Sequence, residues 1–161
     1  MRRRLRVSSV LVSMVALVTL SAQSSGMVEA RVDVELSCPS CAQGLERRLG
    51  RIDQVASVAV RADDGQIVVT PEPGTAIDLI EIRDAVRNAG FIPDAIHVTA
   101  VGVVGGKEMP ELELPNGAVL RLKAGDAMVP ASGRTVRLSG VVEFVGRGEP
   151  PVLLVHTVDA S

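Results

Sequence analysis

The sequence predicts an α+β protein, in which a ferredoxin-like βαββαβ sandwich is followed by a small all-β domain resembling an OB barrel. Between residues 31 and 102, helix and strand patterns follow one another in the order β-α-β-β-α-β. From residue 103 onward, short apolar runs are separated by turns that contain glycine or proline. The chain has 161 residues, enough for two small domains. With two Phe and no Trp or Tyr, its core must consist of Val, Leu, Ile and Ala.

The first 26 residues have the layout of a secretory signal peptide. Four arginines precede a mostly apolar run from Val7 to Leu20, and small polar residues follow it. The run is shorter than the ~20 residues with which a helix crosses a bilayer. We therefore expect a periplasmic or secreted protein, cleaved after Ala22, Gly26 or Ala30. An uncleaved N-terminal membrane anchor is the alternative.

Charge excludes one class of partner. Loss of residues 1–26 removes four arginines and no acid, which leaves 13 basic and 19 acidic residues and a net charge of −6. Residues 103–161 carry 6 basic and 7 acidic residues and one aromatic ring. Neither a basic surface nor a stacking platform is available, so nucleic-acid binding is not expected. We expect a monomer.

The first strand and helix surround the most informative motif. Residues 31–36 alternate apolar and charged side chains, which indicates a half-buried strand. A helix is expected to begin near Cys41, with Ser40 as its N-cap. Its apolar face would comprise Cys41, Leu45, Leu49 and Ile52.

A hairpin, a second helix and a fourth strand complete the first domain. Strands are expected at residues 55–60 and 67–70, joined by an Asp-Gly turn. The helix is expected over about residues 76–89, with Gly90 at its C-terminal cap. A strand over residues 93–101 follows and could run on into the barrel without a linker. Within the barrel we expect short strands, with at most one helical turn near residues 124–129; the strands fall at 112–114, 118–122, 135–145 and 152–158.

Cys38 and Cys41 are the only cysteines of the chain, and they form the motif Cys-Pro-Ser-Cys between the first strand and the first helix. Two residues between the thiols allow both sulfurs to face one point, and the helix N-terminus favours thiolate. Such a pair suits a soft ion of low coordination number, Cu(I) or Hg(II), better than Zn(II), which usually needs four ligands. The motif alone also permits a redox dithiol or a purely structural disulfide. His97 and His156 show no ligand spacing and are interpreted as strand residues.

Residues 31–102 resemble the heavy-metal-associated domain, the fold of copper chaperones and periplasmic mercury-binding proteins. Leu36-Ser37-Cys38-Pro39-Ser40-Cys41 is similar to the family's Met-x-Cys-x-x-Cys. The strand at residues 55–60 also matches, as does the end of the second helix at Ala89-Gly90-Phe91.

The resemblance implies roles for single residues. Cys38 and Cys41 would be the metal ligands, and Phe91 would shield them. Ser37 offers no carboxylate, which favours Cu(I) or Hg(II) over Zn(II). The family's glycines are replaced by Glu35 before the loop and by Asp53-Gln54 before the second strand, which affects metal preference and transfer rate rather than the fold.

The expected function is that of an exported metal-binding protein and not of an enzyme, since no catalytic triad or phosphate-binding loop is recognisable. It would capture a soft ion and transfer it to a membrane metal transporter or to another metal-binding domain. Two alternatives remain at this point. One is a thiol–disulfide redox protein, and the other is an interaction module whose degenerate metal site is held as a disulfide.

Overall fold

The N-terminal part of the molecule is built from four strands and two helices. The computed structural model of the chain describes residues 25–36, 39–146 and 148–160. The elements of this part are β1 (Gly26–Val34), α1 (Pro39–Leu49), β2 (Val55–Arg61), β3 (Gln66–Pro71), α2 (Leu79–Asn88) and β4 (Pro93–Gly105).

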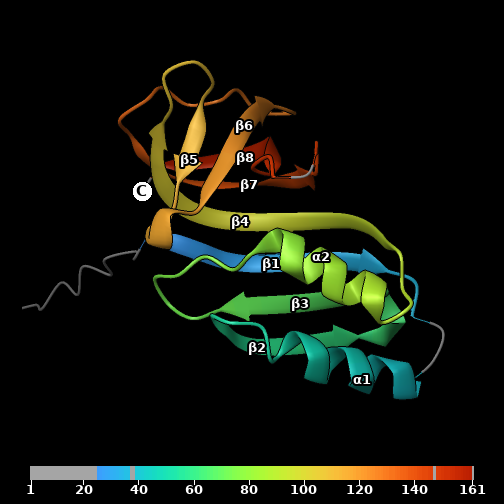
Figure 1. Cartoon of the computed structure of the whole chain (residues 1–161). Helices are drawn as coiled ribbons and strands as arrows, with labels where there is room; N and C mark the ends of the chain where they lie inside the picture. The colour runs from blue at the N-terminus through green and yellow to red at the C-terminus, as the bar shows by residue number, and fades with distance from the viewer. Residues whose placement is uncertain (1–24, 37–38, 147, 161) are drawn as a thin grey trace, which may run out of the picture.

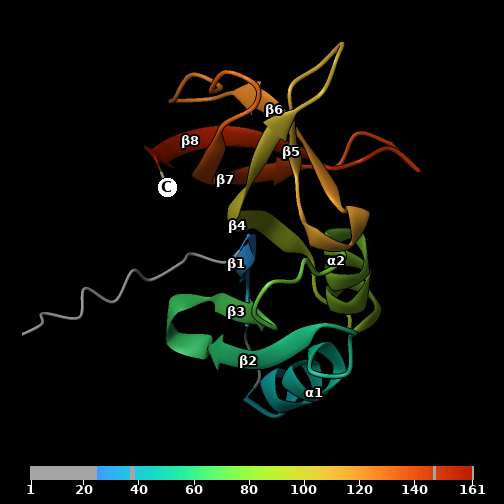
Figure 2. The ribbon, with the colours of Figure 1, turned by 90° about the vertical axis from the view of Figure 1, so that its left-hand side faces the viewer.

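These strands form an antiparallel sheet in the order β2-β3-β1-β4. Both helices pack on the same face of the sheet, as the two views of the ribbon show (Figures 1 and 2). In β3 the alternating side chains of Ile67 and Val69 are fully buried, as expected for the helix-covered face of a two-layer sandwich. The element order and the sheet order confirm the expected ferredoxin-like α+β arrangement.

The C-terminal part is a closed five-stranded barrel. Its strands are β4 together with β5 (Glu111–Glu113), β6 (Val119–Ala124), β7 (Thr135–Glu143) and β8 (Val152–Ala160). The ring runs β4-β5-β6-β8-β7 and closes through pairing of β7 with β4. The pairing of β6 with β8 is parallel, and the other four pairings are antiparallel.

Strand β4 belongs to both parts of the molecule. Residues 97–101 pair with β1 on one edge and with β7 on the other. Beyond Val101 the first edge changes partner, and β5 replaces β1 from Val103 onward. The two parts are therefore joined by one continuous strand, as the sequence indicated, and not by a linker.

The core is aliphatic. Among the described residues no polar or charged side chain is buried, and the buried side chains are Val, Leu, Ile and Ala together with Met27 and Pro71. They form one contiguous cluster that extends from Leu45 of α1 to Leu153 and Val155 of β8. The expected core of Val, Leu, Ile and Ala is thereby confirmed, since these residues provide nearly all of the buried side chains in both parts of the molecule.

Helix α2 has a defined start and a defined end. It begins at Leu79 rather than Ala76, because Ala76 and Ile77 are buried in an extended segment. The Oδ1 atom of Asp78 accepts hydrogen bonds from the backbone N–H groups of Ile80 (2.8 Å) and Glu81 (3.3 Å), so Asp78 is the N-cap.

The C-terminus of α2 is a Schellman motif. The N–H of Gly90 donates to the carbonyl of Arg87, and that of Phe91 donates to the carbonyl of Val86. Gly90 has a φ of +90°, a conformation that glycine adopts without strain. The expected capping role of Gly90 is confirmed, and the motif places Phe91 directly after the helix.

Two local expectations need correction. Helix α1 begins at Pro39, so Ser40 lies inside its first turn and is not the N-cap; the fixed φ of proline suits this first position. The β2–β3 connection is a 3₁₀ turn over Ala62–Asp64 with Gly65 left-handed, not a two-residue Asp-Gly turn. At most one helical turn was expected near residues 124–129, and none forms there, because the N–H groups of Gly125 and Ala127 both donate to the carbonyl of Val155 in β8.

Most of the proposed signal peptide lies outside the described residues, and its last residue, Gly26, opens β1. In the described part of the chain, neither helix has the length and apolar character needed to cross a membrane.

Candidate metal centre

Cys41 lies in the first turn of α1, and its side chain is exposed. The sequence pattern predicted that Cys41 lies on the apolar face of the helix, and that prediction is wrong. The buried face consists of Ala42, Leu45 and Leu49, which are 8% exposed or less. Cys41 lies about 100° around the helix axis from Ala42, at the edge of the buried face, so it is exposed while Ala42 is buried. An exposed sulfur is accessible to an exchanging partner.

Cys41 is disulfide-bonded in this structure. The only other cysteine of the sequence is Cys38. Cys38 and Ser37 lie outside the described residues, so their expected roles stay predictions. A disulfide sulfur is a poor metal ligand, because the ligand form of cysteine is the thiolate. Metal binding at this loop therefore requires prior reduction.

The helix N-terminus favours negative charge at Cys41 after reduction. The first turn of α1 contains no acidic side chain, whereas Arg47 and Arg48 lie in its last turn. The first turn of α1 therefore places no carboxylate of its own at the positive end of the helix dipole. A thiolate formed there is stabilised by the positive end of the helix dipole.

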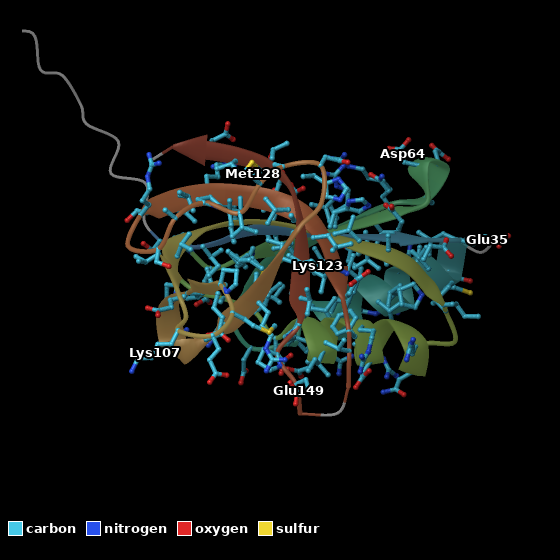
Figure 3. All side chains as sticks on the ribbon, turned by 90° about the horizontal axis from the view of Figure 1, so that it is seen from above. Glu35, Asp64, Lys107, Lys123, Met128 and Glu149 are labelled. Atoms are coloured by element: carbon cyan, nitrogen blue, oxygen red, sulfur yellow. The ribbon has the colours of Figure 1, made fainter. Side chains whose placement is uncertain are left out.

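Apolar residues from two directions surround this end of the sheet. The start of α1 and the loop that follows α2 lie at the same end of the sheet (Figure 1). Leu36 and Phe91 are both partly buried against the main core cluster. Leu36, which stands where the family has methionine, thus packs against the core. Glu35, immediately before the loop, lies at the opposite end of the molecule from Lys107 (Figure 3).

The two histidines lie in strands β4 and β8, and the structure brings them together. Nε2 of His97 is 2.9 Å from Oδ2 of Asp33, and Nδ1 of His156 is 2.8 Å from Oδ2 of Asp126. Both rings line one small cavity of about 130 Å³. Their separation in sequence gave no sign of this proximity, which arises because β7 pairs with both β4 and β8.

Acidic residues do not assemble a further metal site in the described residues. There, no group of three or more His, Cys, Asp or Glu side chains is arranged to hold a metal ion. Asp63 and Asp64 lie exposed in the 3₁₀ turn between β2 and β3.

Comparison with known families identifies the N-terminal part. Residues 31–91 match the family model of the heavy-metal-associated domain. This segment runs from within β1 to the Schellman motif after α2 and includes the cysteine loop. The chain thus contains a heavy-metal-associated domain, and the family predicted from the sequence is confirmed for these residues. The comparison with curated proteins gives no match.

Domains of this family bind and transfer heavy-metal ions and interact with metal transporters or with other metal-binding domains. Binding of a heavy metal is accordingly the general function that the family match implies for residues 31–91.

Proposed function

We propose that this protein is an exported, non-enzymatic carrier of a soft metal ion. Reduced Cys38 and Cys41 capture Cu(I) or Hg(II) as cargo, with Zn(II) less favoured. The observation that carries the proposal is the exposed position of Cys41 in the first turn of a heavy-metal-associated domain.

Transfer proceeds by ligand exchange. In a two-coordinate complex, a thiolate of the acceptor can bind the ion before a thiolate of the donor leaves. The exposure of Cys41 supports this route, because an incoming ligand needs access to the ion. The acceptor is a membrane metal transporter or another metal-binding domain.

Native mass spectrometry of the reduced protein with Cu(I), Ag(I), Hg(II) and Zn(II) tests the proposal. We expect one equivalent of Cu(I), Ag(I) or Hg(II) per chain, and none in the double variant Cys38→Ser, Cys41→Ser. Ser40→Ala is the matched control, since it changes the same turn without removing a thiol. Binding that survives the double variant would show that the cysteines are not the ligands.

The disulfide at Cys41 supports one alternative, in which the site is held oxidised and serves only as local stiffening. Titration of thiols on protein taken from its native compartment separates the two. Reactive thiols or bound metal support the carrier, whereas neither would be found in a spent site. Reduction of insulin by the wild type but not by Cys38→Ser would instead identify a thiol–disulfide oxidoreductase.

We further propose that residues 1–22 are the signal peptide and that the mature protein is periplasmic or secreted. The start of β1 supports the earliest of the three candidate cleavage points. Gly26 already pairs with Val101, and Met27 is 5% exposed. Cleavage after Ala22 leaves these contacts intact, whereas cleavage after Ala30 removes them.

The barrel is proposed to be OB-like and to act as a stabilising or docking module. Its closure with five strands and the parallel pairing of its third and last strands support this class. The division into domains at residues 31–102 and 103–161 likewise stays a proposal.

A further inference from the structure

A cavity of about 340 Å³ lies where β4 changes its pairing partner. Strand β1 pairs with β4 as far as Val101, and β5 takes over at Val103. The start of β1 and the turn after β5 diverge at this point, and the cavity forms between them. Its lining residues come from both parts of the molecule, including Met27 of β1 and Leu114 after β5.

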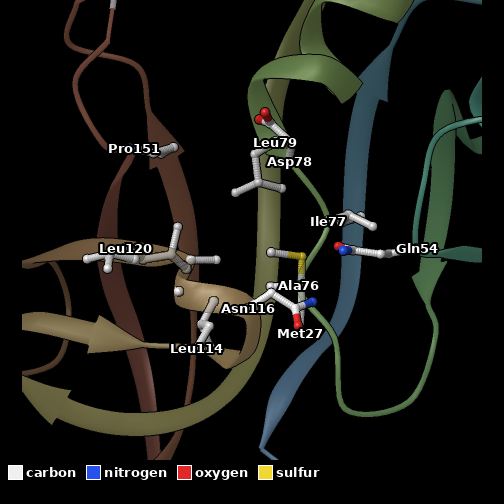
Figure 4. Close-up of a pocket in the computed structure, with 13 residues that line it drawn as sticks. Met27, Gln54, Ala76, Ile77, Asp78, Leu79, Leu114, Asn116, Leu120 and Pro151 are labelled. Carbon is white, nitrogen blue, oxygen red and sulfur yellow. The ribbon is translucent and has the colours of Figure 1, made fainter.

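The walls of the cavity are apolar, with polar groups from two sides (Figure 4). The volume falls at the lower end of the ~300–1,000 Å³ that is usual for binding sites of small ligands. The apolar lining includes Met27, Ala76, Ile77, Leu79, Leu114 and Leu120. The carboxamide of Gln54 points toward Met27 from the side of α1 and β2, and that of Asn116 approaches it from the barrel.

Both carboxamides are available to a ligand. Neither Gln54 nor Asn116 uses its side chain in a hydrogen bond to another described residue. Each offers one acceptor oxygen and two N–H donors. The third polar group, Asp78, uses Oδ1 to cap α2.

The backbone at the same two residues is unusual. Gln54 has a φ of +67° and Asn116 a φ of +62°, and they are the two non-glycine residues with positive φ in the described chain. Glycine would adopt this conformation without strain, and a glutamine in particular is uncommon there. Such strain concentrates at functional sites. Two carboxamide side chains thus stand at the two places where glycine would suit the backbone better.

We propose that this cavity binds a short, extended peptide segment that carries an apolar side chain and no negative charge. The apolar walls receive the side chain. The two carboxamides, on separate walls, hydrogen-bond to peptide groups. This pairing is possible because a carboxamide and a peptide group each offer both an N–H donor and a carbonyl acceptor. None of the lining residues is Arg, Lys or His, and Asp78 adds a negative charge, so an anionic ligand finds no counter-charge.

The cavity is separate from the cysteine loop. Cys41 lies in the first turn of α1, and Gln54 follows the last turn, so most of a helix of roughly 16 Å lies between them. Peptide binding is therefore independent of the metal and persists in the double variant Cys38→Ser, Cys41→Ser. The two proposals can accordingly fail separately.

Amide chemical shifts of the ¹⁵N-labelled full chain provide the test, with three capped pentapeptides as probes. The peptides are acetyl-Gly-Gly-Xaa-Gly-Gly-amide with Leu, Gly or Asp at Xaa. We expect the leucine peptide to shift saturable resonances of residues that line the cavity, and the other two to leave them unchanged. Equal response to the aspartate peptide, or shifts confined to other surfaces, would overturn the proposal.

Single variants distinguish the loss of a carboxamide from the loss of the folded structure. Gln54→Gly and Asn116→Gly remove a carboxamide but keep the backbone conformation, so the protein stays folded while affinity falls about two- to tenfold in each. Ala118 also lines the cavity, so Ala118→Leu fills it and abolishes binding. Gln43→Ala removes an exposed carboxamide of α1 and leaves affinity unchanged.

Wild-type affinity in both glycine variants would mean that the carboxamides do not recognise the peptide. Resonances at the cavity that shift with protein concentration alone would identify a second copy as the occupant, against the proposal.

Discussion

At the scale of single residues, Asp78 defines the start of helix α2 as its N-cap. Its carboxylate satisfies two N–H groups that have no partner within α2. We expect Asp78→Ala to lower the free energy of unfolding by about 1 kcal/mol. Asp78→Asn, which retains an acceptor oxygen, should stay close to the wild type. Urea unfolding followed by circular dichroism measures both, and equal losses in the two variants would rule out capping as the cause.

Ile82 tests the core at the same scale. Its side chain is fully buried in α2 within the aliphatic cluster. We expect Ile82→Ala to cost about 2–5 kcal/mol, and Ile82→Val about 0.5–1.5 kcal/mol, because the larger truncation leaves the larger cavity. Chemical unfolding measures the difference. A loss below about 1 kcal/mol for the alanine variant would contradict the packing described here.

The exposure of Cys41 depends on its structural surroundings as well as on its position in the sequence. Sequence spacing correctly placed Cys41 in the first turn of a helix. The spacing of Cys41, Leu45 and Leu49 then assigned Cys41 to the apolar face. At about 100° per residue, the buried side chains of Ala42, Leu45 and Leu49 span about 60° of the helix circumference, and Cys41 lies about 40° outside that span. Whether such an edge position is covered depends on the layer packed against the helix, which spacing alone does not show.

At the scale of elements, β1 determines where the leader can be removed. Its first residues pair with β4, and Met27 and Ala30 are buried. We expect a chain that begins at Gln23 to fold like the mature protein. A chain that begins at Arg31 should lose several kcal/mol of a typical total of 5–15, through lost pairing and lost burial.

A chain that begins at Met27 is the control for β1, because it keeps the buried residues and loses only the first pair. Urea midpoints should fall in the order Gln23, Met27, Arg31. Intact mass of the exported protein then identifies the natural start. A stable Arg31 chain, or natural cleavage after Ala30, would contradict the role given to the start of β1.

Helix α2 illustrates which boundaries of an element were predictable from the sequence. Gly90 and the apolar periodicity located the end of α2 correctly, since both are local signals. Its start was placed three residues early, because Ala76 and Ile77 are apolar in the helical pattern but are buried for a different reason. They line the cavity at the junction with the barrel, which depends on contacts distant in sequence.

At the scale of the whole molecule, β4 makes the two parts interdependent. Removing the barrel strands would expose one edge of β4 and the core residues that face it, such as Ala100 and Val104. We expect one cooperative unfolding transition for the full chain. We expect a chain ending at Gly105 to be strongly destabilised or aggregated, because an unpaired strand edge promotes association.

Coincident denaturation curves from circular dichroism and NMR check this cooperativity. The informative variant in the full chain is Gly140→Ala, since a Cβ at Gly140 would overlap the carbonyl oxygen of Leu154 and disturb the pairing of β7 with β8. It should shift the transition of both parts together. Two separate transitions, with only the barrel affected, would establish two independent domains.

By itself, the sequence determined the elements, the aliphatic core and the cysteine motif, because each depends on neighbouring residues: on the alternation of apolar side chains, on caps and turns, and on the spacing of two thiols. The βαββαβ order and the heavy-metal-associated family followed from those local patterns. Only the tertiary structure decided the closure of the barrel through β4 and β7, the exposure of Cys41, the shared cavity of His97 and His156, and the cavity where β4 changes partner. These features arise from pairing and packing between segments far apart in the chain. One strand, β4, pairs with β1, β5 and β7, and no local sequence pattern indicates which strands those partners are.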